Sequence, residues 1–277
     1  MLLQASGTTW SARAFAWSFR IVAGVTLAFM MAPVVAVVWV SFFKDKIISF
    51  PPSGYTLAWY AAAWADDSFR NGLYFSLILG VVSAIGSLIL GIPAGYVLGR
   101  AAFRGRDALK ITLLLPMMVP SIVAGSAVYI FYIQTEIATD IQFAGTFLGL
   151  SLAHITLALP WSVRLVTAAM IEFDESLSDA ARSLGASRLT FFRRILLPII
   201  RPAVIGAALF SFIASFVDLE KSLFLIGPGR TTLPIAVINH LEWSLDPSIA
   251  AISTIQIAVV VTAIVLGSRY ARLTRSF

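Results

Sequence analysis

The 277-residue sequence contains no cysteine, only two histidines and few charged residues. The lack of cysteine excludes disulfide bonds and thiolate metal sites. Charged residues make up 12% of the chain, roughly half the share that is usual in soluble domains. The two histidines, His154 and His240, lie far apart in the sequence. They therefore indicate neither a metal cluster nor a catalytic triad.

Nucleotide-binding and catalytic motifs are also missing. No lysine follows a glycine, so the sequence has no Walker A motif. The stretch GPGRTT at 227–232 lacks the G-x-G-x-x-G spacing of a dinucleotide site. The sequence therefore predicts that the chain is not an enzyme and holds no metal or cofactor of its own.

Long apolar runs take up most of the chain, which is 59% hydrophobic and has a mean hydropathy of +0.89. Six runs reach the roughly 18–20 residues that cross a bilayer. The fifth is the weakest, because Asp218, Glu220 and Lys221 interrupt it. The first is longer than a signal-peptide core and precedes Lys44 and Lys46, which predicts a retained transmembrane helix. We expect an all-α, polytopic membrane protein with spans near 21–43, 73–98, 111–133, 147–171, 203–225 and 249–268.

The basic residues are distributed unevenly between alternate polar segments. Segments 1–20, 99–110, 172–202 and 269–277 hold 14 of the 20 lysines and arginines, against four in 44–72, 134–146 and 226–248. Such an excess marks the cytoplasmic side of a membrane protein. The pattern predicts that both termini are cytoplasmic, with 1–20 as an N-terminal segment, 21–268 as the transmembrane domain and 269–277 as a tail. The net charge of +6 then reflects topology rather than a nucleic-acid partner.

The polar segment 172–202 is predicted to fold as two short helices. Ser176 is a candidate N-cap of the first, Asp179 extends a capping box, and Gly185 suits its left-handed end. Ser187 is a candidate cap of the second helix, which should stop near Pro198, and Pro202 suits the first turn of the fifth span. By periodicity alone, this segment equally fits a hairpin lying on lipid headgroups.

The same segment resembles the cytoplasmic signature of ABC importer permeases, which reads Glu-Ala-Ala, Gly, Ile-x-Leu-Pro. The matching residues are Asp179-Ala180-Ala181, Gly185 and Ile195-x-Leu197-Pro198, with Asp179 in place of Glu. The segments at 88–100, 113–125, 223–237 and 246–255 are similar to the second membrane subunit of spermidine/putrescine importers.

This resemblance implies a type I ABC importer permease fold and transport by alternating access. It implies a heterodimer with a second homologous permease in the bacterial inner membrane. It also implies an extracytoplasmic solute-binding protein and a cytoplasmic ATPase dimer that binds ATP and magnesium. We call segment 172–202 the coupling loop. By resemblance, its docking and turn residues are Asp179, Ala180, Ala181, Arg182, Leu184, Gly185, Arg188, Ile195, Leu197 and Pro198.

Two further groups of residues have physical interpretations. Gly91, Gly95 and Gly99 form a small-residue stripe that predicts helix packing, with a substrate role as the alternative. Ionisable groups in a span usually face a cavity or a partner. Asp218 and Lys221 are spaced to pair with each other, which leaves Glu220 free. The candidate translocation path therefore comprises Asp218, Glu220, Lys221, Phe212 and Phe216. His154 is expected to face the bundle and form hydrogen bonds.

The leading function is an ATP-driven importer subunit for a small solute, with a polyamine favoured. Two departures from the polyamine pattern, Val217 and Lys221, favour a zwitterionic or anionic solute instead. The alternatives are thus another amine, an amino-acid-like solute or a phosphonate. A stand-alone secondary transporter or channel is a third class, in which the coupling loop would be only a surface hairpin.

Overall fold

The computed structural model describes the backbone of residues 10–273 and the side chains of residues 15–271. Over this range all the regular elements are helices, which loops connect, and one isolated β-bridge links Phe43 with Tyr55. Among the described residues, six helices are long and apolar enough to cross a membrane, which confirms the expected span count. The predicted terminal segments lie partly outside the described residues.

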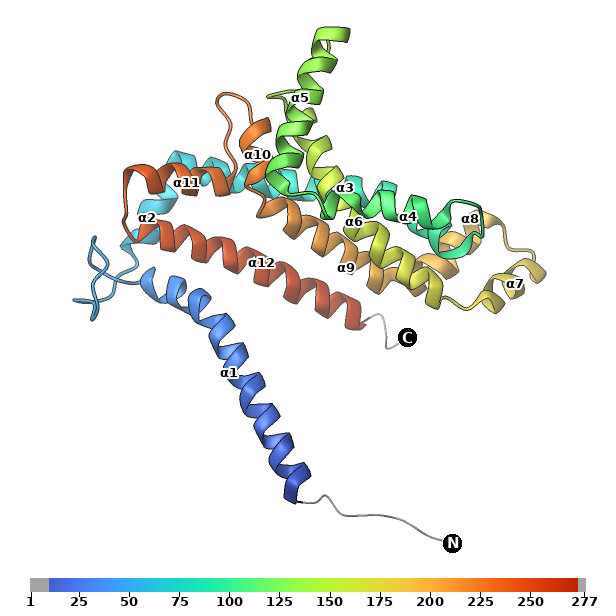
Figure 1. The fold of residues 1–277 in the computed structure, drawn as a ribbon, viewed down its shortest axis with the longest axis horizontal. Coiled ribbons are helices and arrows are strands. Elements are labelled where there is room, and N and C mark those ends of the chain that lie inside the picture. The colour runs from blue at the N-terminus through green and yellow to red at the C-terminus, as the bar shows by residue number, and fades with distance from the viewer. Residues whose placement is uncertain (1–9, 274–277) are drawn as a thin grey trace. The chain divides into compact units, whose positions relative to one another are not determined.

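The helices follow one another in the order shown in Figure 1. They are α1 (Trp10–Val40), α2 (Ala58–Ala65), α3 (Asp67–Arg100), α4 (Arg106–Leu114), η1 (Leu115–Met117), α5 (Ser121–Thr139), α6 (Phe147–Glu172), α7 (Glu175–Ser183), α8 (Arg188–Phe191), η2 (Phe192–Leu196), α9 (Leu197–Phe216), α10 (Glu220–Leu225), α11 (Leu233–Trp243) and α12 (Ser248–Leu273).

Two of the predicted spans were placed wrongly. The third, expected at 111–133, is divided into α4, η1 and α5, because Pro116 and Pro120 lack the N–H that a continuous helix needs. The fifth, expected at 203–225, ends at Phe216, and α10 begins separately at Glu220. By contrast, α3 continues through Pro93.

The chain divides into two compact units. The first comprises Met1–Ala63 and Leu245–Thr254. In this unit Phe43 is fully buried, with the rings of Trp39, Phe50 and Tyr55 around it. The indole of Trp59 donates to the Phe43 carbonyl at 2.8 Å. An aromatic cluster therefore organises the segment that follows α1.

The second unit comprises Trp64–Ser244 and Ile255–Phe277, and its centre is the packing of α3, α6 and α9 (Figure 1). Gly91, Gly95 and Gly99 lie against α6, as the small-residue stripe predicts. A Cβ atom at Gly95 would lie 2.7 Å from Cβ of Val166, which is too close for any side chain. These glycines therefore permit the close approach of α3 and α6.

Hydroxyl groups also connect these three helices. Ser162 on α6 bonds to Ser87 on α3 at 3.0 Å and to Ser211 on α9 at 3.1 Å. All three serines are fully buried. Since hydrocarbon offers no alternative partners, hydrogen bonds between helices help to fix their relative positions.

Candidate functional site

The coupling loop contains the predicted pair of short helices, but its caps differ in part. The side chain of Asp174, not Ser176, caps α7 by accepting the Ser176 N–H at 2.9 Å. This bond holds the pKa of Asp174 below its usual value. The capping box at Asp179 was also wrong, because that carboxylate pairs with Arg182 one turn later. Gly185 has φ +75°, and Ser187 accepts the Thr190 N–H at 3.2 Å, as predicted.

The end of the second short helix was wrongly placed at Pro198. Helix α8 continues through the π-helical turn η2 into α9 without a stop. Pro198 directly follows this π-helical turn, whose Leu197 N–H bonds to the Phe192 carbonyl five residues earlier, so the irregular turn accommodates the missing proline N–H in a continuous helix. Pro202, expected in that first turn, instead lies inside α9. Ile195 packs against a buried cluster that contains Leu196 and Val166.

The two alanines of the loop motif face different surroundings. Ala181 is 4% exposed and packs within its own chain, so it cannot itself present a docking surface. Ala180 is exposed, and Leu184 is 88% exposed. The outward surface of α7 therefore consists of a small residue beside a protruding apolar one.

Arg100 at the end of α3 fixes the start of the coupling loop. Its guanidinium donates to the Phe173 carbonyl at 3.1 Å, pairs with Glu175 at 3.3 Å and lies over the Phe173 ring. Sequence reasoning missed this anchor. The signal available was a cation in the last turn of a span, where it interacts favourably with the helix dipole. The loop is thus tied to the helix that packs on α6.

Arg182 and Arg188 border a cavity of about 530 Å³ beside the loop. Tyr96 from α3 and the aromatic rings of Phe191 and Phe192 also line it. Both predicted loop arginines therefore lie at the same hollow, although they belong to different short helices.

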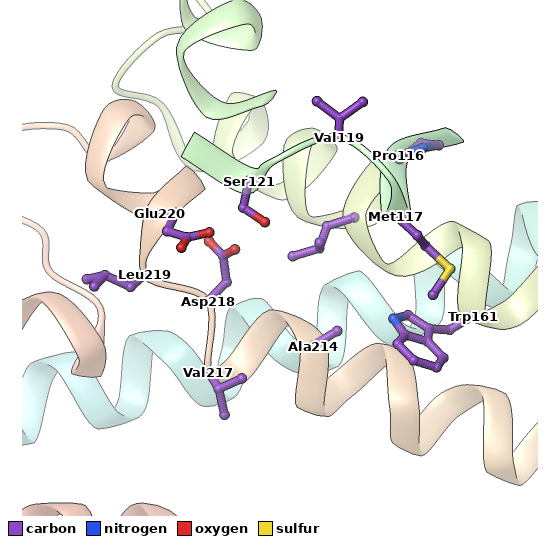
Figure 2. Close-up of a pocket in the computed structure, with 11 residues that line it drawn as sticks. Pro116, Met117, Val119, Ser121, Trp161, Ala214, Val217, Asp218, Leu219 and Glu220 are labelled. Atoms are coloured by element: carbon purple, nitrogen blue, oxygen red, sulfur yellow. The ribbon is translucent and has the colours of Figure 1, made fainter. Parts of the chain in front are cut away.

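A second cavity, of about 410 Å³, lies where α9 ends (Figure 2). Asp218 and Glu220 occupy one end of it, and Trp161 with Met117 the other. The remaining walls are supplied by Pro116, Val119, Ser121, Leu157, Ala214, Val217 and Leu219. The broken third and fifth spans therefore both border this hollow, an arrangement found at transporter binding sites.

The candidate path residues are separated by the fold. Asp218 and Glu220 line the cavity, whereas Lys221, Phe212 and Phe216 are not among its lining residues. Phe216 is fully buried and stacks on Phe212 at 5.4 Å between ring centroids. The aromatic side chain at the cavity is instead Trp161, which sequence reasoning missed. Its one sequence signal was a tryptophan beside Pro160 in the middle of a span.

Asp218 holds the turn between α9 and α10. Its Oδ2 atom accepts the backbone N–H groups of Lys221 and Ser222, each at 3.1 Å. The expected Asp218–Lys221 side-chain pair is not formed, and Lys221 Nζ has no hydrogen-bond partner among the described residues. The Asp218 carboxylate therefore accepts hydrogen bonds from the backbone, because these two amides would otherwise have no partner at the start of α10.

His154 supports this turn from α6, which confirms its expected role as a bundle-facing hydrogen-bonding residue. It is fully buried, and its ring nitrogens lie 2.8 Å from Ser215 Oγ and 3.1 Å from Ser222 Oγ. Ser215 Oγ in turn donates to Ser83 Oγ on α3 at 3.2 Å. One polar network therefore joins α3, α6, α9 and α10, and it reaches the cavity residue Asp218 through Ser222. The serines of this network were missed, since isolated serines carry no sequence signal.

Comparison with known proteins places the chain among transport proteins. Residues 91–275 match the family described as binding-protein-dependent transport system inner membrane component. The putrescine transport system permease protein PotI of Escherichia coli K12 is 30% identical over 84% of this chain and 83% of its own. The spermidine/putrescine permease protein PotC of Haemophilus influenzae is 29% identical over 90% of this chain and 94% of its own.

Other similar proteins carry different names. The putative 2-aminoethylphosphonate permease protein PhnV of Salmonella paratyphi A is 24% identical over 95% of this chain and 97% of its own. A solved bacterial ABC transporter that imports alginate has a chain with a TM-score of 0.71 and 16% identity. That comparison covers 95% of this chain and 98% of the other, and it establishes the fold.

Proposed function

This chain belongs to the family of binding-protein-dependent transport system inner membrane components, and we propose that its cargo is a small organic amine, with a polyamine favoured. It is a multi-pass permease of the ABC importer type, a transport subunit rather than an enzyme. ABC importer permeases of this kind work with an ATPase and a binding protein.

The observation that carries the cargo proposal is the pair of carboxylates at the cavity. Asp218 and Glu220 lie at one end, and Trp161 lies at the other (Figure 2). Carboxylates attract an ammonium group, and an indole face attracts both an organic cation and an alkyl chain. Two relatives named for putrescine or spermidine transport support the same class.

A zwitterionic amine is the second candidate cargo, either amino-acid-like or a phosphonate. The buried cation Lys221 beside the carboxylates favours it, and so does the relative named for 2-aminoethylphosphonate transport. A stand-alone transporter or channel is disfavoured by the family match, since its members are components of binding-protein-dependent systems.

In the proposed assembly the coupling loop docks on a cytoplasmic ATPase dimer, which binds ATP and magnesium. Leu184 is the apolar contact, Ala180 allows close approach, and Arg182 and Arg188 meet acidic groups. The 88% exposure of Leu184, together with the exposed Ala180, supports this role, because both side chains are accessible to a partner.

The remaining partners follow from the same proposal. A second, homologous permease forms a heterodimer with this chain in the bacterial inner membrane. A solute-binding protein delivers the cargo from outside, and both termini and the coupling loop lie in the cytoplasm. The excess of basic residues in the coupling loop and in the segments on its side supports this orientation.

The test replaces Glu220 by Gln, which removes the charge and keeps the shape. We expect ATP-dependent uptake of radiolabelled putrescine into proteoliposomes that contain the complete transporter to fall by about tenfold, because the exposed carboxylate of the cavity is lost. Glu242→Gln, an exposed carboxylate on α11 outside the cavity, is the matched control and should transport normally.

Two results would count against this proposal. Equal uptake by the Glu220→Gln and Glu242→Gln proteins would show that Glu220 does not contribute to transport. Failure of the unaltered transporter to take up putrescine, spermidine or a zwitterionic amine would exclude the cargo class itself.

A further inference from the structure

Lys221 is a buried cation that the proposed transport path does not use. The residue is 4% exposed, and Nζ forms no hydrogen bond with any described residue. Burying an ammonium group is costly unless a nearby opposite charge compensates it. The surroundings of Lys221 must therefore supply that charge.

Asp218 is the carboxylate placed to do so. It lies one helical turn before Lys221, its side chain is 6% exposed, and its Oδ2 atom accepts the Lys221 backbone N–H at 3.1 Å. The two side chains form no direct ion pair, so the Lys221 ammonium and the Asp218 carboxylate attract each other through the low-dielectric interior of the turn. The positive charge of Lys221 and the negative charge of Asp218 therefore share one buried turn.

His154 adds no charge to this balance, because it is fully buried and burial disfavours its protonated form. Its two ring nitrogens contact the hydroxyl groups of Ser215 and Ser222. Ser215 Oγ donates to Ser83 Oγ and therefore accepts from the Nδ1–H group, so in a neutral ring Nε2 accepts from Ser222 Oγ. Asp218 Oδ2 lies 3.7 Å from Nε2, beyond hydrogen-bonding distance.

Glu220 differs from Asp218 in its surroundings. Its side chain is exposed and lines the cavity, and within the described residues it forms no ion pair. The three ionisable groups of the turn thus consist of one compensated carboxylate, its buried cation and one uncompensated carboxylate. Their sum is a single negative charge.

We infer that Lys221 determines the specificity of the cavity by limiting its net charge to minus one, so that the site accepts one ammonium group at a time. This inference rests on the proposed amine cargo. A polyamine passes the site one ammonium after another, while its alkyl chain contacts Trp161. An amine whose second end carries no charge is accepted equally well.

The experiment compares two probes that differ by one charge, putrescine and N-acetylputrescine. Uptake of each is measured in proteoliposomes with the complete transporter and the same binding protein throughout. For each protein, the uptake rate of putrescine is divided by that of N-acetylputrescine. This rate ratio is then compared between a variant and the unaltered protein, so the preference of the shared binding protein cancels.

Lys221→Met removes the cation and retains most of the side-chain length. We expect it to raise the rate ratio about tenfold, because the site then holds two uncompensated carboxylates. Lys221→Arg keeps the charge and should leave the ratio unchanged. The double variant Asp218→Asn with Lys221→Met restores a net charge of minus one and should return the ratio to that of the unaltered protein.

Asp218→Asn alone keeps the inference testable if Lys221→Met does not assemble. It leaves Lys221 opposite Glu220, so the site becomes neutral and the rate ratio should fall. Ratios unchanged in both single variants, with only the absolute rates altered, would overturn the inference. Lys221 would then be structural, or neutralised by a carboxylate of the second permease. Failure of the unaltered transporter to move either probe would instead refute the amine cargo.

Discussion

The coupling loop and the turn at 217–221 are both polar interruptions of an apolar chain, and each starts a short helix with an aspartate. Asp174 accepts the Ser176 N–H at the start of α7, and Asp218 accepts two N–H groups at the start of α10. Their surroundings are opposite, because Asp174 is exposed whereas the Asp218 side chain is 6% exposed. The same aspartate cap therefore occurs once in contact with solvent and once inside the protein.

The difference shows where each region obtains its stability. In the coupling loop, short-range bonds such as Asp179 with Arg182 and Ser187 with Thr190 connect residues three apart. At the buried turn, His154 reaches Ser215 and Ser222 from more than sixty positions away. A polar group removed from water must find a partner wherever the fold supplies one.

The largest effect is expected from Leu184→Asp in the coupling loop. If α7 docks in an apolar groove, a charge at this exposed position should reduce ATP-dependent uptake about a hundredfold while the fold stays intact. Uptake in proteoliposomes and retention of the ATPase during purification are measured together. Leu184→Met is the conservative control and should retain transport; normal uptake by Leu184→Asp would leave the loop as a surface hairpin.

An intermediate effect is expected from His154→Phe at the buried turn. The change keeps an aromatic ring but leaves two buried serine hydroxyls with one partner fewer, which should cost about 1–3 kcal/mol in the free energy of unfolding. Thermal unfolding in detergent and hydrogen exchange of residues 217–226 measure it.

Thr156→Val on the same helix is the control for this variant, because Thr156 is exposed and, among the described residues, its hydroxyl bonds only to the Leu152 carbonyl one turn earlier. It should change stability little. Equal stability of the two variants, with unchanged exchange at 217–226, would mean that the His154 network does not hold the turn.

The smallest effect is expected from Ser187→Ala, which removes the cap of α8. Loss of one exposed cap should destabilise the short helix by about 1 kcal/mol, with a less than threefold reduction in uptake. Ser187→Asp retains a capping oxygen and should behave like the unaltered protein. A loss of transport as large as that of Leu184→Asp would show that Ser187 itself contacts the ATPase.

The sequence was most informative where structure depends on neighbours along the chain. The cap at Ser187 and the left-handed turn at Gly185 were predicted, because each needs only residues within one turn. The predicted cap of α7, Ser176, lies two positions after the observed cap, Asp174. The sequence could not distinguish them, because both residue types can accept the N–H groups at a helix start. The stripe of Gly91, Gly95 and Gly99 predicted close packing but not the partner helix.

The sequence alone determined that this chain is a membrane protein with six spans and a permease coupling loop, because hydropathy, basic residues and motif spacing are local properties. Only the tertiary structure decided which polar residues share a site. It brought Trp161 to the cavity with Asp218 and Glu220, buried Phe216 in the core, and separated Lys221 from the cavity. The physical reason is that burial and pairing depend on which helices meet, and residues far apart in the sequence determine those contacts.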